Sequence, residues 1–213
     1  MKYPDFSYEQ KLWKKGFGYV IGIDEAGRGA WAGPIVVAAC VFAPKVQIEN
    51  LGINDSKLLK PREREKLAKE IKKRVLAWDV TEVGVGVINK IGIGKATEKA
   101  MRKTVKDIIK KLKKEANFFV LVDYFYIPYL RGFGRKNQLG IKDGDQKSIS
   151  IAAASILAKV HRDKIMRSLG RRSRFKVYGW GENKGYGTKK HQKAIEIYGL
   201  TRYHRKDFVR SFK

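Results

Sequence analysis

The sequence has little cysteine and no long apolar run, and each shortage excludes a class of protein. Its one cysteine, Cys40, cannot form an internal disulfide, and the apolar residues around it indicate a buried strand in a reducing compartment. No stretch approaches the roughly 18 apolar residues that a membrane-spanning helix needs, and the first residues do not read as a secretion signal. We therefore expect a soluble, cytoplasmic protein with no membrane partner.

Acidic residues are also scarce. The chain has 21 Asp and Glu against 47 Lys and Arg, which gives a formal charge of +26. This excess is larger than solubility requires, and the attraction of Lys and Arg to phosphate makes nucleic acid the first candidate partner. The alternative is a plain solvated basic surface, as in a ribosomal protein or an ion-pair-rich thermophile protein.

The 213 residues and the 43% hydrophobic content suffice for one α/β domain with an appendage. Runs rich in Val and Ile at 18–24 and 34–42 predict a long hairpin. Alternation over 79–88 predicts a third strand with one packed face, and the apolar run 117–123 predicts a buried fourth strand. A short fifth strand is expected near 139–142.

Helices are expected between these strands. Pro61 opens a helix in which apolar residues recur every four positions, and 95–114 reads as an amphipathic crossover helix. A crossover helix followed by a buried strand implies parallel pairing, with the functional edge at the carboxyl ends of the strands. Ser148 to Ser168 is rich in small residues and predicts a helix packed closely on the sheet.

Two regions differ in charge and composition. We expect a compact catalytic domain over residues 1–165 and a basic, helical C-terminal extension over 166–213 that packs on the same domain. Seven basic residues of this extension are candidates to hold the backbone of a nucleic acid duplex without reading its sequence. They are Arg171, Arg172, Arg174, Lys189, Lys190, Arg205 and Lys206.

The few acids are grouped near strand ends. Asp24 and Glu25 lie where an apolar run gives way to a glycine loop, Asp123 ends another apolar run, and Asp145 precedes the small-residue helix. Magnesium prefers oxygen ligands and is commonly held by a few carboxylates together with substrate phosphate. If the strands are neighbours, these acids predict a site for metal-dependent phosphoryl chemistry at one edge of the sheet.

One geometric condition applies to the adjacent pair. Neighbouring residues of a strand point to opposite faces, so Asp24 and Glu25 can share metals only if the strand ends or kinks between them. The glycines that follow favour such a break. A zinc site is not expected, because one cysteine and three scattered histidines (His161, His191 and His204) supply no ligand spacing.

Six segments follow the pattern of a known family in its own order. They are 22–33 (GIDEAGRGAWAG), 54–57 (NDSK), 122–123, 144–163 (GDQKSISIAAASILAKVHRD), 184–188 (KGYGT) and 203–212 (YHRKDFVRSF). On these segments the chain resembles type 2 ribonuclease H (ribonuclease HII). Enzymes of that family hydrolyse the RNA strand of RNA/DNA hybrids and nick duplex DNA at embedded ribonucleotides.

The resemblance implies a fold and a metal site. The fold is an RNase H-like mixed five-stranded sheet flanked by helices, with a C-terminal helical extension. The implied metal-binding and catalytic acids are Asp24, Glu25, Asp123 and Asp145. They would hold two divalent ions, Mg or Mn, for hydrolysis that leaves 3′-hydroxyl and 5′-phosphate ends.

The resemblance also implies how substrate is recognised. Gly27, Arg28 and Gly29 would contact the sugar-phosphate at the ribonucleotide, Tyr186 would pack on the following sugar, and Lys57 would contact a phosphate. A glycine loop can approach the 2′-hydroxyl closely, which is the group that distinguishes RNA from DNA. Taken without the resemblance, Tyr186 reads equally well as a structural aromatic in a glycine turn.

Three positions need separate comment. The family often has Pro where this chain has Ala30, and Gly or Ser where it has Tyr124. Asp163 is a weaker catalytic candidate, because an ion pair with Arg162 or a neighbouring lysine explains it equally well.

The expected partners are RNA/DNA hybrids and ribonucleotide-containing duplex DNA, bound by a monomer. Residues 207–213 lack the glutamine-led spacing of a sliding-clamp peptide, so clamp binding is not expected. Two rival functions stay open. One is another RNase H-like nuclease, such as an integrase or junction resolvase, and the other is a non-enzymatic RNA-binding protein.

Overall fold

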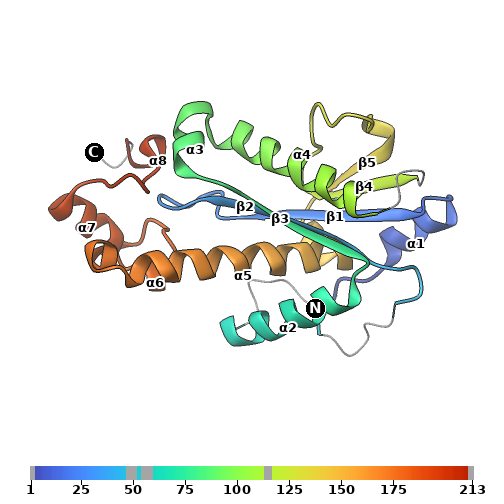
Figure 1. Ribbon diagram of the computed structural model, residues 1–213, viewed down its shortest axis with the longest axis horizontal. Coiled ribbons are helices and arrows are strands. Elements are labelled where there is room, and N and C mark those ends of the chain that lie inside the picture. Colours follow the sequence, from blue (N-terminus) through green and yellow to red (C-terminus); the bar gives the residue numbers. More distant parts are fainter. Residues whose placement is uncertain (1–2, 47–51, 54–59, 113–116, 211–213) are drawn as a thin grey trace.

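The computed structural model describes residues 3–46, 52–53, 60–112 and 117–210. A five-stranded sheet runs through the centre of the molecule and helices cover both of its faces (Figure 1). The strands are β1 (Tyr19–Ala26), β2 (Ile35–Val41), β3 (Ala77–Val83), β4 (Phe118–Asp123) and β5 (Gln138–Ile141). Their order in the sheet is β3-β2-β1-β4-β5.

The described residues form helices between and after the strands, including those predicted from Pro61, over 95–114 and over 148–168. They are α1 (Ser7–Lys14), α2 (Pro61–Arg74), α3 (Val85–Ile91), α4 (Ile93–Lys111), α5 (Ile149–Arg171), α6 (Trp180–Asn183), α7 (Lys189–Tyr198) and α8 (Lys206–Arg210). Short 3₁₀ turns are η1 (Arg135–Asn137), η2 (Gly144–Gln146) and η3 (Ser173–Tyr178). No helix of the described residues is long and apolar enough to cross a bilayer.

Strand directions confirm the mixed α/β sheet. β2 is antiparallel to both β1 and β3, whereas β4 is parallel to β1 and β5 is parallel to β4. The crossover helix α4 makes the parallel β1–β4 pairing possible, because parallel neighbours cannot be joined by a tight turn. The carboxyl ends of β1 and β4 therefore meet at one edge of the sheet.

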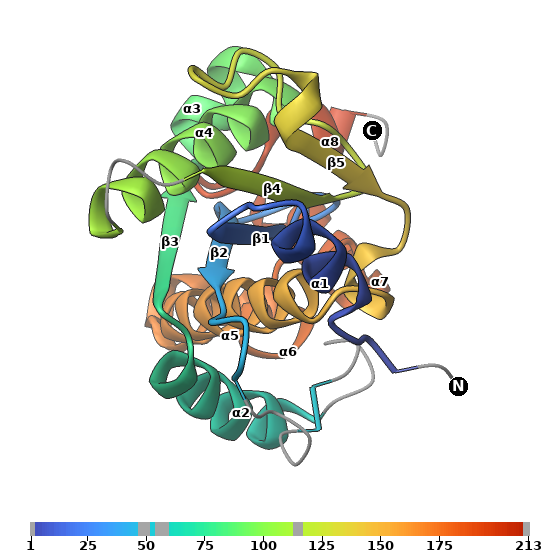
Figure 2. The same ribbon diagram turned by 90° about the vertical axis from the view of Figure 1, so that its right-hand side faces the viewer.

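Two apolar layers hold the sheet between helices. Seen along the strands, α4 covers one face, and α5 covers the other with α2 beyond it (Figure 2). The packing of α5 is unusually close, because a Cβ at Gly22 would lie 2.2 Å from the carbonyl carbon of Ser150. Small residues on α5 and a glycine on β1 thus let the two backbones approach, as the composition of the helix predicts.

One prediction of local structure needs correction, and one helix lies where none was predicted. The third strand was predicted over 79–88, but β3 ends at Val83 and α3 follows. Val85 and Ile88 are both buried, and their spacing of three residues fits one face of a helix. The alternation of Val83, Val85 and Val87 fits a strand equally well, so the sequence alone does not decide between the two. The sequence leads to no expectation of a helix before the first strand, but Ser7–Lys14 form α1.

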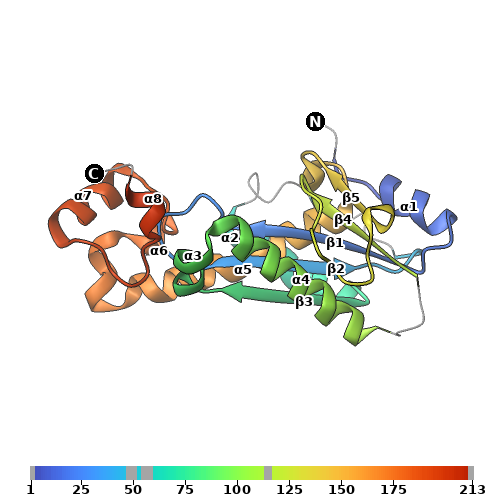
Figure 3. The ribbon, with the colours of Figure 1, turned by 90° about the horizontal axis from the view of Figure 1, so that it is seen from above.

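The C-terminal extension has a small core of its own, centred on the fully buried Trp180. Tyr178 stacks on that indole with ring centroids 5.1 Å apart, and Phe175 stacks at 5.4 Å. In Figure 3 α6, α7 and α8 gather at one end of the molecule, away from α1. The helix α5 runs without interruption across the predicted boundary at residue 165.

Candidate active site

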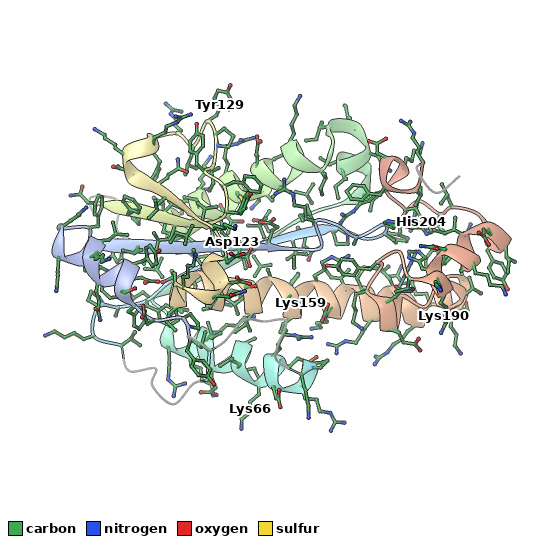
Figure 4. All side chains as sticks on the ribbon, turned by 180° about the vertical axis from the view of Figure 1, so that it is seen from behind. Lys66, Asp123, Tyr129, Lys159, Lys190 and His204 are labelled. Carbon is green, nitrogen blue, oxygen red and sulfur yellow. The ribbon has the colours of Figure 1, made fainter. Side chains whose placement is uncertain are left out.

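Asp24 and Asp123 lie side by side at the edge where β1 and β4 end. The register pairs Ile23 of β1 with Val122 of β4, and the next residue in each strand is the acid. Asp24 is only 5% exposed. Figure 4 places Asp123 near the middle of the molecule, close to the sheet and to α5. The parallel register thus brings together two carboxylates that are almost one hundred positions apart in the sequence.

The charges of these acids act on one another. Burial raises the pKa of Asp24 well above its usual value, and the carboxylates of Glu25 and Asp123 raise it further. Burial also raises the pKa of Glu25, where the guanidinium of Arg28 opposes the shift and Asp123 adds to it. Three negative groups in a poorly solvated place repel each other, and a bound cation would relieve that repulsion.

Asp145 approaches the same edge from η2. Its side chain is buried, and the preceding residue, Gly144, donates its backbone N–H to Asp123 Oδ1 at 2.7 Å. A Cβ at Gly144 would lie 3.2 Å from that same carboxylate oxygen and 2.7 Å from Ile151 Cδ1. The glycine therefore lets the turn that carries Asp145 sit directly against Asp123.

The expected break between Asp24 and Glu25 is absent. β1 continues through both residues to Ala26, and the pairing with β2 continues with it. The two carboxylates interact all the same, since, beyond the effect of burial, Glu25 raises the pKa of Asp24 and Asp123 raises that of Glu25, so the break is not needed to bring them together. Within the described residues, no three His, Cys, Asp or Glu side chains are arranged closely enough to hold a metal ion. The acids are grouped by charge and by strand register, but they do not form a closed cage.

The donor set nevertheless suits a hard divalent cation. All four candidates are carboxylates, which Mg²⁺ and Mn²⁺ prefer, and Mg²⁺ commonly keeps several waters and needs few protein ligands. Glu25 Oε2 is buried and has no hydrogen-bond partner among the described residues. Its other oxygen, Oε1, lies 3.5 Å from Arg28 Nη1. A buried carboxylate oxygen without a partner is costly, and a cation would satisfy it.

Two buried arginines hold the glycine loop that follows β1. Arg205 is 0% exposed and donates to the carbonyl oxygens of Gly27 at 2.7 Å, Arg28 at 2.9 Å and Gly33 at 3.0 Å. Arg162 donates to the carbonyls of Ala32 and Pro34, both at 3.1 Å. These contacts fix the backbone of the loop from below.

Gly27 is required by this arrangement. Its φ is +90°, a value that residues with side chains rarely adopt, and a Cβ there would lie 1.9 Å from Arg162 Nε. At Gly29, by contrast, a Cβ would meet nothing within 4 Å. Gly27 is therefore needed for the backbone conformation and packing of the loop. Gly29 instead leaves open space on the loop that follows Asp24 and Glu25.

A second glycine turn, around Tyr186, packs on the first. The backbone N–H groups of Trp31 and Ala32 donate to the carbonyl of Gly185 at 2.8 and 3.0 Å. Tyr186 is 38% exposed, and the guanidinium of Arg162 lies 5.4 Å from the centre of its ring. The residue that was predicted to contact a sugar is thus partly open to solvent and adjoins the loop predicted to read the ribonucleotide.

The remaining predicted residues differ in their placement. Lys57 lies outside the described residues. Arg205 was predicted to hold a duplex backbone, but it is buried under the glycine loop and cannot do so. The other six basic candidates of the extension are exposed. Asp163 pairs with Lys159 at 3.1 Å and with Arg64 at 3.5 Å, whereas Arg162 points to the loop instead.

Two supporting residues escaped the sequence interpretation. The first is Arg205, because charge alone does not distinguish a solvated arginine from one that supports a loop. The second is Glu9 on α1, which is fully buried and accepts hydrogen bonds from Ser148 Oγ at 2.6 Å and from the backbone N–H of Ser150 at 2.9 Å. The sequence signals it only by helical spacing, since Glu9 lies three residues before the apolar Leu12 on α1.

Comparison with known proteins shows the family and the fold of the chain. The family model for Ribonuclease HII matches residues 21–213. A Ribonuclease HII from Caldanaerobacter subterraneus subsp. tengcongensis is 46% identical over 202 residues, which cover 95% of this chain and 78% of that protein.

Solved structures show the same fold. RNase HII from Archaeoglobus fulgidus, solved in a complex with PCNA, is 26% identical with a TM-score of 0.66, covering 88% of this chain and 93% of that one. Bst-RNase HIII, solved in complex with Mn²⁺, has a TM-score of 0.70 at 21% identity, and the match covers 91% of this chain and 65% of that one.

The predicted RNase H-like fold and the resemblance are both confirmed. The chain belongs to the ribonuclease HII family and is a metal-dependent ribonuclease H, an enzyme that hydrolyses the RNA strand of RNA/DNA hybrids.

Proposed function

We propose that the chain cleaves RNA/DNA hybrids and also nicks duplex DNA on the 5′ side of embedded ribonucleotides, leaving 3′-hydroxyl and 5′-phosphate ends. Asp24, Glu25, Asp123 and Asp145 would hold two divalent cations, Mg²⁺ or Mn²⁺. Such ions activate a water on one side of the scissile phosphate and stabilise the leaving oxygen on the other. The observation that carries the proposal is the β1–β4 register, which sets Asp24 beside Asp123.

The acids contribute by their position and charge. Asp24 is hydrogen-bonded to the backbone N–H of Glu25 at 2.6 Å, and Asp123 to that of Gly144 at 2.7 Å, so both carboxylates are oriented from the protein side. Groups fixed in this way need little rearrangement when substrate phosphate arrives. The raised pKa of Asp24 supports a place where negative charge is concentrated and a cation is favoured.

Recognition of the ribonucleotide would come from the glycine loop and from Tyr186. Gly29 has open space where a side chain would be, which allows backbone groups to approach the 2′-hydroxyl. Tyr186 would check the next sugar by packing. The exposed basic residues of the extension would hold the duplex backbone, and this predicts a steep loss of affinity as salt rises.

The test compares three substrates in Mg²⁺ and in Mn²⁺: an RNA/DNA hybrid, a DNA duplex with one ribonucleotide, and an all-DNA duplex. We expect cleavage of the first two only, with a nick on the 5′ side of the ribonucleotide. Asp24→Asn should lose cleavage and keep binding to the hybrid. Undiminished metal-dependent cleavage by Asp24→Asn would remove the basis of the proposal, and cutting of the all-DNA duplex would favour an integrase or resolvase.

A further inference from the structure

Exposed aromatic side chains lie directly after the strand that ends in Asp123. Tyr124, Phe125, Tyr126 and Tyr129 are all exposed, and Tyr129 reaches 91%. We call residues 124–129 the aromatic segment. Large aromatic residues normally bury most of their surface, and a contiguous exposed group of them marks a binding surface.

Other residues in and around the aromatic segment fix its backbone. Ile127 and Leu130 are buried in the core between the sheet and α4. The side chain of Gln138 accepts from the N–H of Ile127 at 3.0 Å and donates to its carbonyl at 3.3 Å. Arg102 donates to the carbonyl of Pro128 at 3.0 Å. The aromatic rings therefore project from an anchored loop, and Tyr129 lies at its outer edge (Figure 4).

Positive charge lies beside the aromatic segment, and the chain that follows it carries no acid as far as residue 142. Arg28 lies over the ring of Phe125 at 4.7 Å, and Arg135 lies over the ring of Tyr126 at 5.2 Å. Residues 124–142 contain no Asp or Glu. Aromatic faces combined with cations are how proteins bind single-stranded nucleic acid, because bases stack on the rings while the cations attract phosphates.

The segment is connected to the acids by direct contacts. Asp123 immediately precedes Tyr124, and Arg28, which lies over Phe125, is also 3.5 Å from Glu25. A nucleic acid strand that leaves the acids in this direction meets the rings next. Bases inside a duplex already stack on both neighbours, so the rings can stack only on unpaired bases or on the pair that ends a duplex.

We propose that the aromatic segment binds unpaired nucleotides that adjoin the hybrid. Hybrids with a single-stranded extension on one side of the cut are then preferred over blunt hybrids. The inference rests on the proposed function for the position of the cut, but the binding itself is measurable without cleavage.

The experiment measures affinity by fluorescence anisotropy in EDTA for a blunt RNA/DNA hybrid and for the same hybrid with a few unpaired nucleotides at either end. The parent should bind one extended form about fivefold or more tightly, the least expected from one stacked base. The variant Tyr126→Ser/Tyr129→Asn should lose this preference, because it removes two rings and Asn tolerates the positive φ of 55° at position 129. The control Tyr198→Ala, which removes an exposed tyrosine of α7, should retain it.

Several outcomes would overturn the inference. They are equal affinity of the parent for blunt and extended hybrids, a preference that survives in the double variant, and an equal loss of affinity for both substrates. A dimer in sedimentation that the double variant dissociates would assign the rings to a second copy instead. A parallel measurement of cleavage of the blunt hybrid in Mg²⁺ separates this inference from the proposed function. A parent that binds the extended hybrid more tightly but cleaves no hybrid contradicts the proposed function and leaves this inference intact.

Discussion

Arg205 donates from Nη1 to the carbonyl oxygen of Gly27 at 2.7 Å, although the two residues are 178 positions apart. The same guanidinium reaches the carbonyls of Arg28 and Gly33. Burial, and then the positive charge of Arg162, lower the pKa of Arg205, so this support costs free energy that its hydrogen bonds must offset. The C-terminal extension thereby determines where the glycine loop lies.

Arg205→Lys should therefore lower the free energy of unfolding by about 2–4 kcal/mol, because one ammonium cannot replace three oriented guanidinium contacts. Cleavage at a single ribonucleotide should fall more than binding to the hybrid does, since the loop is misplaced while the exposed basic residues remain. Urea titration and single-turnover cleavage measure the two effects. Arg210→Lys, at an exposed arginine of the same extension, is the control and should change neither.

Gly27→Ala and Gly29→Ala form a matched pair. The first places a Cβ 1.9 Å from Arg162 at a positive φ and should destabilise the protein by at least about 2 kcal/mol. The second enters open space and should keep stability within about 0.5 kcal/mol. If Gly29 adjoins the 2′-hydroxyl, its alanine variant should still cleave at least about tenfold more slowly. Parent-like cleavage by Gly29→Ala would argue against close approach of the sugar at that position.

Glu9→Ala should weaken the start of α5. The carboxylate accepts from Ser148 Oγ and from the N–H of Ser150, and its loss leaves both donors buried, at a cost of about 2 kcal/mol in the free energy of unfolding. Because α5 follows the turn that carries Asp145, the variant should also need a higher Mg²⁺ concentration for half-maximal cleavage. Glu196→Ala, an exposed acid on α7, should leave the Mg²⁺ requirement as it is.

The histidines of the extension predict a loss of stability in acid. Burial, and then the nearby His191, lower the pKa of His204 from 6.5 to about 4. The unfolded chain therefore binds a proton between these values that the folded protein does not, and stability present above pH 6.5 is lost as pH falls towards 4. The loss attributable to His204 should reach about 3 kcal/mol. Urea titrations from pH 7.5 to 4.5 should show a shallower decline of the free energy of unfolding in His204→Asn than in the parent.

The sheet and its acidic edge could be predicted because each depends on local pattern. Val- and Ile-rich runs, a crossover helix and an acid at each strand end predict that Asp24 and Asp123 meet if their strands are neighbours, and the β1–β4 pairing meets that condition. The continuation of β1 through Glu25 could not be predicted, since the glycines after Ala26 read as an early break. The secondary structure of Val85 could not be predicted either, because the residues around it fit a strand and a helix equally well. Packing of α3 against α4 favours the helix.

The burial of Arg205 could not be predicted from the sequence for a different reason. A chain with 47 basic residues gives no reason to single out one of them, and only the folded loop supplies the carbonyl groups that make its burial tolerable. Stacking of Tyr178 and Trp180 around the histidines likewise depends on contacts that no local periodicity encodes.

The backbone of α5 packs directly against Gly22 of β1, which holds the helix firmly on the sheet. This helix begins beside Asp145 and carries Arg162, which contacts the glycine loop, so one rigid element sets the spacing between a proposed metal ligand and the loop proposed to contact the ribonucleotide. Inserting one residue midway along it would turn everything beyond by about 100°. The two ends would then face different directions even though every residue that makes them up remained present.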